Sequence, residues 1–178
     1  MLNHGLSTGA LFLLVGMIYD RRHTRMIEDF GGLWKQLPIF SALLLVVTFS
    51  SIGLPGLNGF VGEFLILLGA FAVTPGWTAW AATGMILGAI YMLWMFRRVI
   101  FGPLTNPENQ KLKDLDGREI LILAPVVALI VFMGVYPQPF LSRMKPSIDL
   151  TLKRVFATQG MSTAVNTTTG GRNQNDGR

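Results

Sequence analysis

The sequence predicts an all-α membrane protein with about four spanning helices, one of them broken, and a C-terminal amphipathic helix. Of its 178 residues, 51% are hydrophobic and 14% are charged, against about 25% charged in an ordinary soluble domain. Between Lys35 and Arg97 only Glu63 carries a formal charge. Soluble helices need a charged face toward water, so this composition excludes a soluble enzyme, a nucleic-acid-binding protein and a disordered chain.

Apolar runs place the spans, because a helix of about 20 apolar residues crosses the hydrocarbon core. We expect residues 1–139 to form the transmembrane part, 140–156 a surface amphipathic helix and 157–178 a disordered tail. Within the transmembrane part, the spans are expected at about residues 2–19, 39–73 (broken at 53–59), 78–96 and 120–136.

The distribution of basic residues favours a single broken span over 39–73. The net charge of +5 comes from cations that flank the apolar runs, and such connections lie on the cytoplasmic side. The two basic connections fall on the same side only if 39–73 crosses once. The cations in these connections are Arg21, Arg22, Arg25 and Lys35 in the first, and Arg97, Arg98, Lys111, Lys113 and Arg118 in the second.

The break has the composition of an irregular backbone at membrane depth. Proline lacks an N–H group and glycine permits unusual dihedral angles. A broken helix is tolerated only where its freed backbone groups are buried in protein or line a hydrated cavity, and transporters bind ions at such places. The break residues are Gly53, Pro55, Gly56, Asn58 and Gly59.

Glu63 is the first candidate for proton translocation. It follows the break by one or two helical turns, where the helix N-terminus partly stabilises a carboxylate. An ionisable residue inside a membrane is costly, and by default it indicates function. The alternative is a structural glutamate that caps the helix or pairs with another chain.

His4 is the second candidate, because Ser7 and Thr8 continue a polar stripe along the first span and imidazole can transfer protons near neutral pH. The alternative is a histidine that hydrogen-bonds between packed helices. His23 lies among arginines and is interpreted as a solvated loop residue. Without any cysteine, thiolate ligation of iron–sulfur clusters or zinc is excluded, and we expect no catalytic residue, metal or cofactor in this chain.

Four sequence blocks, which occur in one order, together resemble a known family. They are Asn3-His4-Gly5-Leu6-Ser7-Thr8-Gly9-Ala10-Leu11-Phe12, Arg22-His23-Thr24-Arg25, Phe30-Gly31-Gly32-Leu33-Trp34 and Gly53-Leu54-Pro55-Gly56-Leu57-Asn58-Gly59-Phe60-Val61-Gly62-Glu63-Phe64. Over about residues 1–156 the chain resembles the C-terminal part of the antiporter-like subunit M family of bacterial NADH–quinone oxidoreductase, respiratory complex I, whose mitochondrial counterpart is subunit 4.

The resemblance implies two inverted repeats, each with one broken helix, and a proton path through buried Lys, His and Glu residues. Glu63 matches the glutamate on the family's second broken helix, and His4 matches the buried histidine on the preceding helix. The family's earlier helices have no counterpart here, so we expect a fragment. Its expected partners are the missing N-terminal part, other membrane-arm subunits and the lipid bilayer, with no nucleic acid.

The resemblance further implies a multi-pass protein of the bacterial cytoplasmic membrane. It would be a proton-translocating subunit of an enzyme whose NAD, FMN, iron–sulfur clusters and quinone bind on other subunits. Two alternatives remain open at this stage. One is a subunit of a multisubunit cation/proton antiporter or of an energy-converting hydrogenase, and the other is a non-catalytic structural membrane segment.

Overall fold

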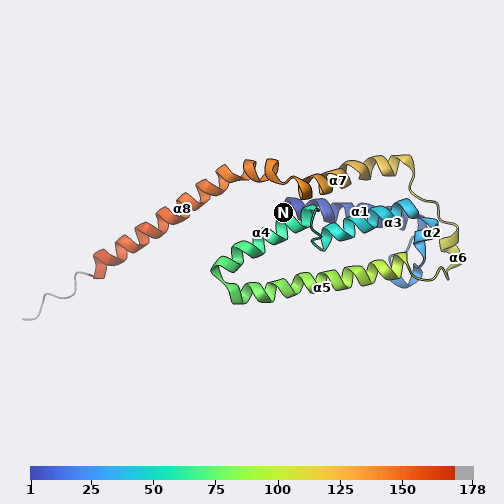
Figure 1. Ribbon diagram of the computed structural model, residues 1–178, viewed down its shortest axis with the longest axis horizontal. Coiled ribbons are helices and arrows are strands. Elements are labelled where there is room, and N and C mark those ends of the chain that lie inside the picture. Colours follow the sequence, from blue (N-terminus) through green and yellow to red (C-terminus); the bar gives the residue numbers. More distant parts are fainter. Residues whose placement is uncertain (171–178) are drawn as a thin grey trace, which may run out of the picture. The chain divides into compact units, whose positions relative to one another are not determined.

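The computed structural model describes residues 1–170, with side chains to residue 157. The chain divides into two compact units, the first of which is Met1–Pro137. Within the first unit, α1 (Leu2–Arg22), α3 (Pro38–Ser51), α4 (Asn58–Val73), α5 (Pro75–Ile100) and α7 (Gly117–Val135) run back and forth (Figure 1). The connections hold the short elements η1 (Ile27–Asp29), α2 (Leu33–Gln36) and α6 (Pro107–Gln110).

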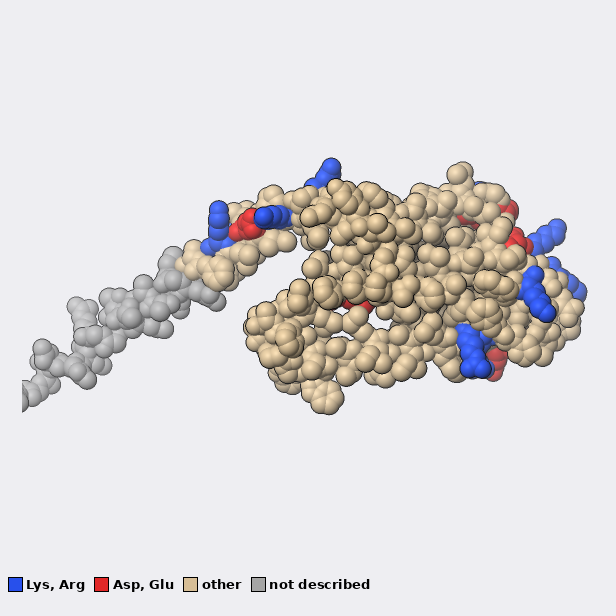
Figure 2. Space-filling view, in the orientation of Figure 1, with Lys and Arg blue, Asp and Glu red and all other residues tan. Residues whose placement is uncertain are grey.

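The second span is broken, as predicted. Among the described residues, α1, α5 and α7 are long and apolar enough to cross a membrane, whereas α3 and α4 are shorter apolar helices. In Figure 1, α3 and α4 continue in one overall direction before α5 returns. The α1–α3 and α5–α7 connections therefore lie at the same end, where basic side chains of this unit gather (Figure 2). This arrangement agrees with the one predicted from the charges.

The interruption itself is shorter than the sequence indicated. Helix α3 ends at Ser51 and α4 begins at Asn58, so Asn58 and Gly59 form the first turn of α4. The irregular segment includes Gly53 and Gly56, with φ angles of 73° and 92°, a region that glycine occupies without steric cost. Asn58 joins the helix because its side chain hydrogen-bonds to neighbouring helices, as described below.

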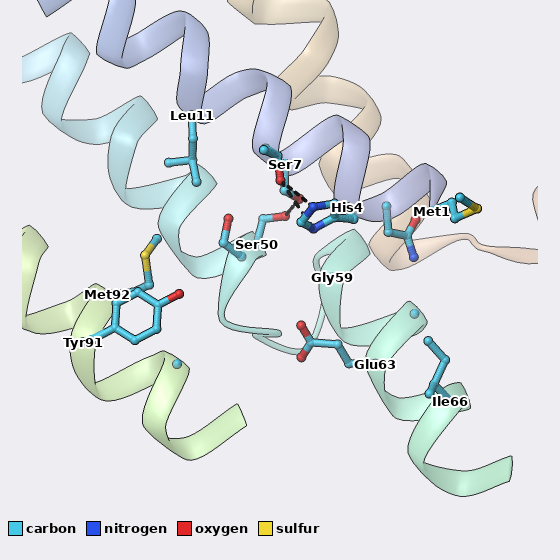
Figure 3. Close-up of a pocket in the computed structure, with 15 residues that line it drawn as sticks. Met1, His4, Ser7, Leu11, Ser50, Gly59, Glu63, Ile66, Tyr91 and Met92 are labelled. Atoms are coloured by element: carbon cyan, nitrogen blue, oxygen red, sulfur yellow. Dashed lines mark hydrogen bonds between the residues drawn. The ribbon is translucent and has the colours of Figure 1, made fainter. Parts of the chain in front are cut away.

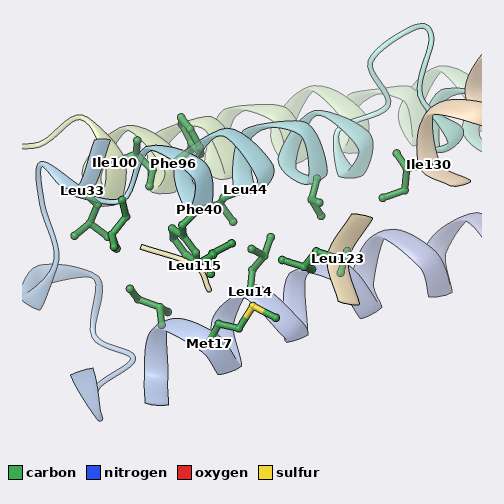
Figure 4. Close-up of a cluster of buried hydrophobic side chains, with 14 residues drawn as sticks. Leu14, Met17, Leu33, Phe40, Leu44, Phe96, Ile100, Leu115, Leu123 and Ile130 are labelled. Carbon is green, nitrogen blue, oxygen red and sulfur yellow. The ribbon is translucent and has the colours of Figure 1, made fainter. Parts of the chain in front are cut away.

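The hydrophobic core lies between α1, α3 and α7. Leu14 from α1 and Leu123 from α7 are wholly buried (Figure 4), and so is Val47 from α3. By contrast, only 6% of the apolar window of α5 is buried inside the protein. Such an apolar exposed helix suits lipid or further protein helices rather than water.

An ion pair ties α1 to α7 at the end of the unit that carries the basic connections. The two terminal nitrogens of the Arg21 guanidinium donate to the two carboxylate oxygens of Glu119, at 2.8 and 2.6 Å. Arg21 also donates to the backbone carbonyls of Met17, Lys113 and Asp114. The sequence had identified Arg21 only as a loop cation, because its partner lies 98 positions away.

The second unit begins at Gln138 and is described here by itself. It holds α8 (Gln138–Gly170), so helix covers the predicted amphipathic segment at 140–156. It also continues through residues 157–170, where the sequence predicted a disordered tail. Once a helix is nucleated, each further residue adds a backbone hydrogen bond. Composition alone does not include this cooperative contribution. The remainder of that predicted tail, residues 171–178, lies outside the described residues.

Candidate functional site

Glu63 lies in the second turn of α4 and points toward the break (Figure 3). A methyl group built on Gly53 would overlap the Glu63 carboxylate, so this carboxylate lies directly against the irregular backbone. Glu63 is half-buried. Within the described residues it has no hydrogen bond and no ion pair. It therefore does not cap α4, and no described residue of this chain balances its charge.

A cavity of about 300 Å³ lies beside Glu63, between α1, the end of α3, α4 and α5. Figure 3 shows that His4, Ser7, Ser50 and Tyr91 line it from the surrounding helices. A second cavity, of about 400 Å³, lies between the end of α3, α4 and α5 and is also lined by Glu63 and Tyr91. The two cavities share Ser51, Ile66, Gly88 and Tyr91 as well as Glu63, so they adjoin each other beside this carboxylate.

His4 lines the first cavity together with Glu63. Its side chain is exposed within this unit, and the Thr8 hydroxyl lies 3.4 Å from each ring nitrogen. No bond joins His4 to Glu63 in the described structure, so any transfer between them needs an intermediate such as water. His23 lies elsewhere: it ends α1 in a left-handed conformation and its ring contacts Tyr19 at a centroid distance of 5.9 Å.

A buried polar cluster formed by Ser7, Ser50 and Asn58 adjoins this cavity. The hydroxyl oxygens of Ser7 and Ser50 are 2.6 Å apart, and the Asn58 carbonyl oxygen lies 3.3 Å from the Ser7 hydroxyl and 2.5 Å from the Ser50 hydroxyl, so it can accept from either serine. The Asn58 amide in turn donates to the backbone carbonyl of Asn3 at 3.1 Å. The cluster therefore connects α1, the end of α3 and the start of α4.

Sequence reasoning included Ser7 in a polar stripe and Asn58 in the break, but it missed Ser50. The available signal was its position in the last turn before the break, where a helix end needs polar partners. Predicting the cluster would have required knowing that α1 packs against that turn, which is a tertiary contact.

The arrangement of Glu63, His4 and the cavity suits proton exchange better than covalent catalysis. Within the described residues, no group of three or more His, Cys, Asp or Glu side chains could hold a metal ion. The carboxylate can bind or release one proton, and the adjoining cavity has room and polar groups for water. These features, together with the apolar helices and the broken span, define the class: an integral membrane protein with an ionisable site at a helix break.

The chain belongs to the NADH:quinone oxidoreductase/Mrp antiporter transmembrane family, whose sequence model matches residues 1–90. It is 44% identical over 160 residues to NADH-quinone oxidoreductase subunit M of Rhodobacter capsulatus, covering 90% of this chain and 31% of that protein. It is 47% identical over 149 residues to NADH-ubiquinone oxidoreductase chain 4 of Marchantia polymorpha, covering 84% of this chain and 30% of that one.

A solved structure, respiratory complex I from Thermus thermophilus with bound NADH, contains a similar chain. The TM-score is 0.69 at 38% sequence identity, over 76% of this chain and 28% of that chain. This chain therefore spans about a third of the length of the relatives it matches. The family resemblance predicted from the sequence is confirmed, and the protein is embedded in a membrane.

Proposed function

We propose that this chain carries part of the proton path in a membrane subunit of an NADH–quinone oxidoreductase, in which electron transfer elsewhere drives proton transport. The observation that carries the proposal is the half-buried Glu63 carboxylate, which lies against the break, has no partner among the described residues and lines two cavities. The names of the relatives support the choice of enzyme. In this proposal the chain acts as a subunit of the enzyme and holds no redox centre.

Glu63 would bind and release the transported proton. His4, on the other side of the shared cavity, would pass protons to or from it through water. Carboxylic acid, imidazole and water form hydrogen-bonded chains along which protons can move without movement of the backbone. Gly53 in the break lets the backbone approach the carboxylate closely.

The proposal places the chain as a multi-pass protein in a bacterial cytoplasmic membrane, in contact with lipid and with other membrane-arm subunits. The exposed apolar surface of α5 supports these contacts. The residues that would precede this region in its longer relatives would be a further partner. NAD, FMN, iron–sulfur clusters and quinone would bind to other subunits.

The test replaces Glu63 in the complex that contains this chain. Glu63→Gln keeps the shape of the side chain and removes its acid–base chemistry, so NADH-driven proton translocation in inverted membrane vesicles should be lost. Glu108→Gln is the matched control, because Glu108 is an exposed carboxylate in α6 that pairs only with Lys111 among the described contacts. Full proton translocation by an assembled Glu63→Gln complex would contradict the proposal.

The family description also names the Mrp antiporter, which supports cation/proton antiport as the second candidate function. Antiport would persist in vesicles without NADH when a sodium or potassium gradient is imposed, and it would depend on Glu63. Proton movement that requires NADH favours the oxidoreductase, whereas exchange driven by a cation gradient alone favours the antiporter.

A further inference from the structure

We infer that Asn58 is a positioning residue, which holds α1 against α4 so that His4 and Glu63 line one cavity. This inference rests on the proposed function for the roles of His4 and Glu63, and on the geometry of the break for the role of Asn58. Nothing in the proton path itself requires an asparagine, because an amide does not exchange protons as a carboxylate or an imidazole does.

The contacts of Asn58 support a positioning role. Its side chain is wholly buried and lies in the first turn of α4, five positions before Glu63. Its carbonyl oxygen can accept from Ser7 of α1 and from Ser50 of α3, while its amide donates to the backbone of Asn3. One side chain therefore fixes three helix segments, and Asn3 directly precedes His4 in the sequence.

The energetics favour a single arrangement of these helices. A buried polar group that loses its partner costs more free energy than a typical hydrogen bond contributes. Sliding of α4 along α1 would separate the Asn58 carbonyl from the Ser7 hydroxyl and the Asn58 amide from the Asn3 carbonyl, and it would leave the buried Asn58 amide without its acceptor. The cluster therefore specifies the register between α1 and α4. Apolar packing is less specific and would discriminate little between registers.

The chain offers a direct reporter of this register. A Cβ atom built on Gly62 lies 3.7 Å from the Cβ atom of Asn3, which falls within the range of disulfides, about 3.5–4.5 Å. Gly62 directly precedes Glu63, so a disulfide between positions 3 and 62 reports on the site. The chain contains no cysteine, so no native cysteine of this chain competes for the new disulfide. The Asn3→Cys variant also retains the backbone carbonyl at position 3.

The experiment measures the rate of disulfide formation in the Asn3→Cys/Gly62→Cys chain in its membrane, under a mild oxidant. Adding Asn58→Leu should slow the reaction about fivefold, the effect of about 1 kcal/mol on an equilibrium. Thr48→Val is the matched control, since Thr48 is equally buried on α3 but its hydroxyl has no partner in the described residues. We expect this control to leave the rate unchanged.

A conservative variant separates positioning from general destabilisation. Asn58→Asp keeps an oxygen that can accept from the serines but replaces the amide that donates to Asn3, so it should restore only part of the lost rate. If Asn58→Leu does not accumulate, Ser7→Ala removes one of the same bonds with less damage and should slow the reaction about twofold. An unchanged rate in Asn58→Leu, or in Ser7→Ala where only that variant accumulates, would overturn the inference, and so would equal rates for Asn58→Asp and Asn58→Leu.

This outcome is separate from that of the proposed function. If Glu63→Gln still translocates protons, the proposed function fails, but the disulfide rates still decide whether Asn58 sets the register. If the rates do not depend on Asn58, the positioning role fails and the function of Glu63 is unaffected.

Discussion

Glu63 and Glu119, the half-buried and the buried glutamate of the first unit, have opposite surroundings. Glu119, at the end with the basic connections, binds Arg21 in a bidentate pair and also accepts the backbone N–H of Asp116. Glu63, at the break, has no hydrogen bond or ion pair within the described residues and lies beside two cavities. The comparison separates a charge that stabilises the fold from one that is left available for exchange.

Because their surroundings differ, the two carboxylates should respond differently to substitution. Removing a partner from a satisfied pair leaves the other charge uncompensated, so the cost appears in stability. Removing the charge of a group that has no partner costs little stability, so any loss appears in function. Substitutions at and around the two carboxylates should therefore differ widely in their effect on the free energy of unfolding.

Arg21→Met should give the largest loss of stability, about 3 kcal/mol, because it leaves the Glu119 carboxylate without its partner. It also removes the side-chain hydrogen bonds to three backbone carbonyls. Thermal unfolding of the chain in detergent measures the change. Lys111→Met serves as the control, since the Lys111–Glu108 pair is exposed and should contribute less than about 1 kcal/mol. Equal effects of the two substitutions would remove the distinction between a buried and an exposed pair.

Gly53→Ala should destabilise the chain by about 2 kcal/mol, because its φ angle disfavours an L side chain. The added methyl group would also overlap the Glu63 carboxylate. Gly56→Ala isolates that contact, since Gly56 also has a positive φ but open space around it. Chemical unfolding of both variants should show the larger loss at Gly53, and the reverse order would mean that Glu63 does not lie against the break.

Asp114→Ala should cost about 1 kcal/mol, the usual contribution of a helix N-cap interaction. The Asp114 carboxylate accepts the backbone N–H groups of Ile39 and Phe40, at 2.8 and 3.1 Å, at the start of α3. Asp20→Ala is a suitable comparison, because Asp20 is an exposed acid near the end of α1. A shift in the unfolding temperature only for Asp114→Ala is expected, and equal shifts would argue against the cap.

Glu63→Gln should give the smallest change in stability, within about 0.5 kcal/mol, because it removes no bond within the described structure. The same thermal unfolding measurement applies, with Glu119→Gln as the matched glutamate. A large loss of stability in Glu63→Gln would mean that Glu63, like Glu119, has a partner that stabilises the fold.

The sequence predicted the elements better than the contacts between them. Hydropathy and the positions of the cations were sufficient for the spans and for the break in the second one. Hydropathy is a local signal, and the positions of the cations depend only on whether the chain crosses the membrane an odd or even number of times between them. The start of α4 at Asn58 was not predicted, because the side-chain bonds that draw Asn58 into the helix come from α1 and α3.

The same limit applies to the two carboxylates. The isolation of Glu63 within a long uncharged stretch made it visible in the sequence. The role of Glu119 was not visible, because a glutamate at a helix start is ordinary and Arg21 lies far from it along the chain. His4 and Glu63 were each chosen from their local surroundings. Their shared cavity depends on the packing of α1 against α4, which no local pattern contains.

The most direct test of the central claim is whether Glu63 changes its protonation state during turnover. Infrared difference spectroscopy of the complex that contains this chain can follow the carboxylic acid C=O stretch while NADH is oxidised. The account predicts a C=O band that appears or disappears on turnover in the parent complex and is absent from the Glu63→Gln complex. The same carboxylic acid bands in both complexes would contradict the claim that Glu63 carries the proton.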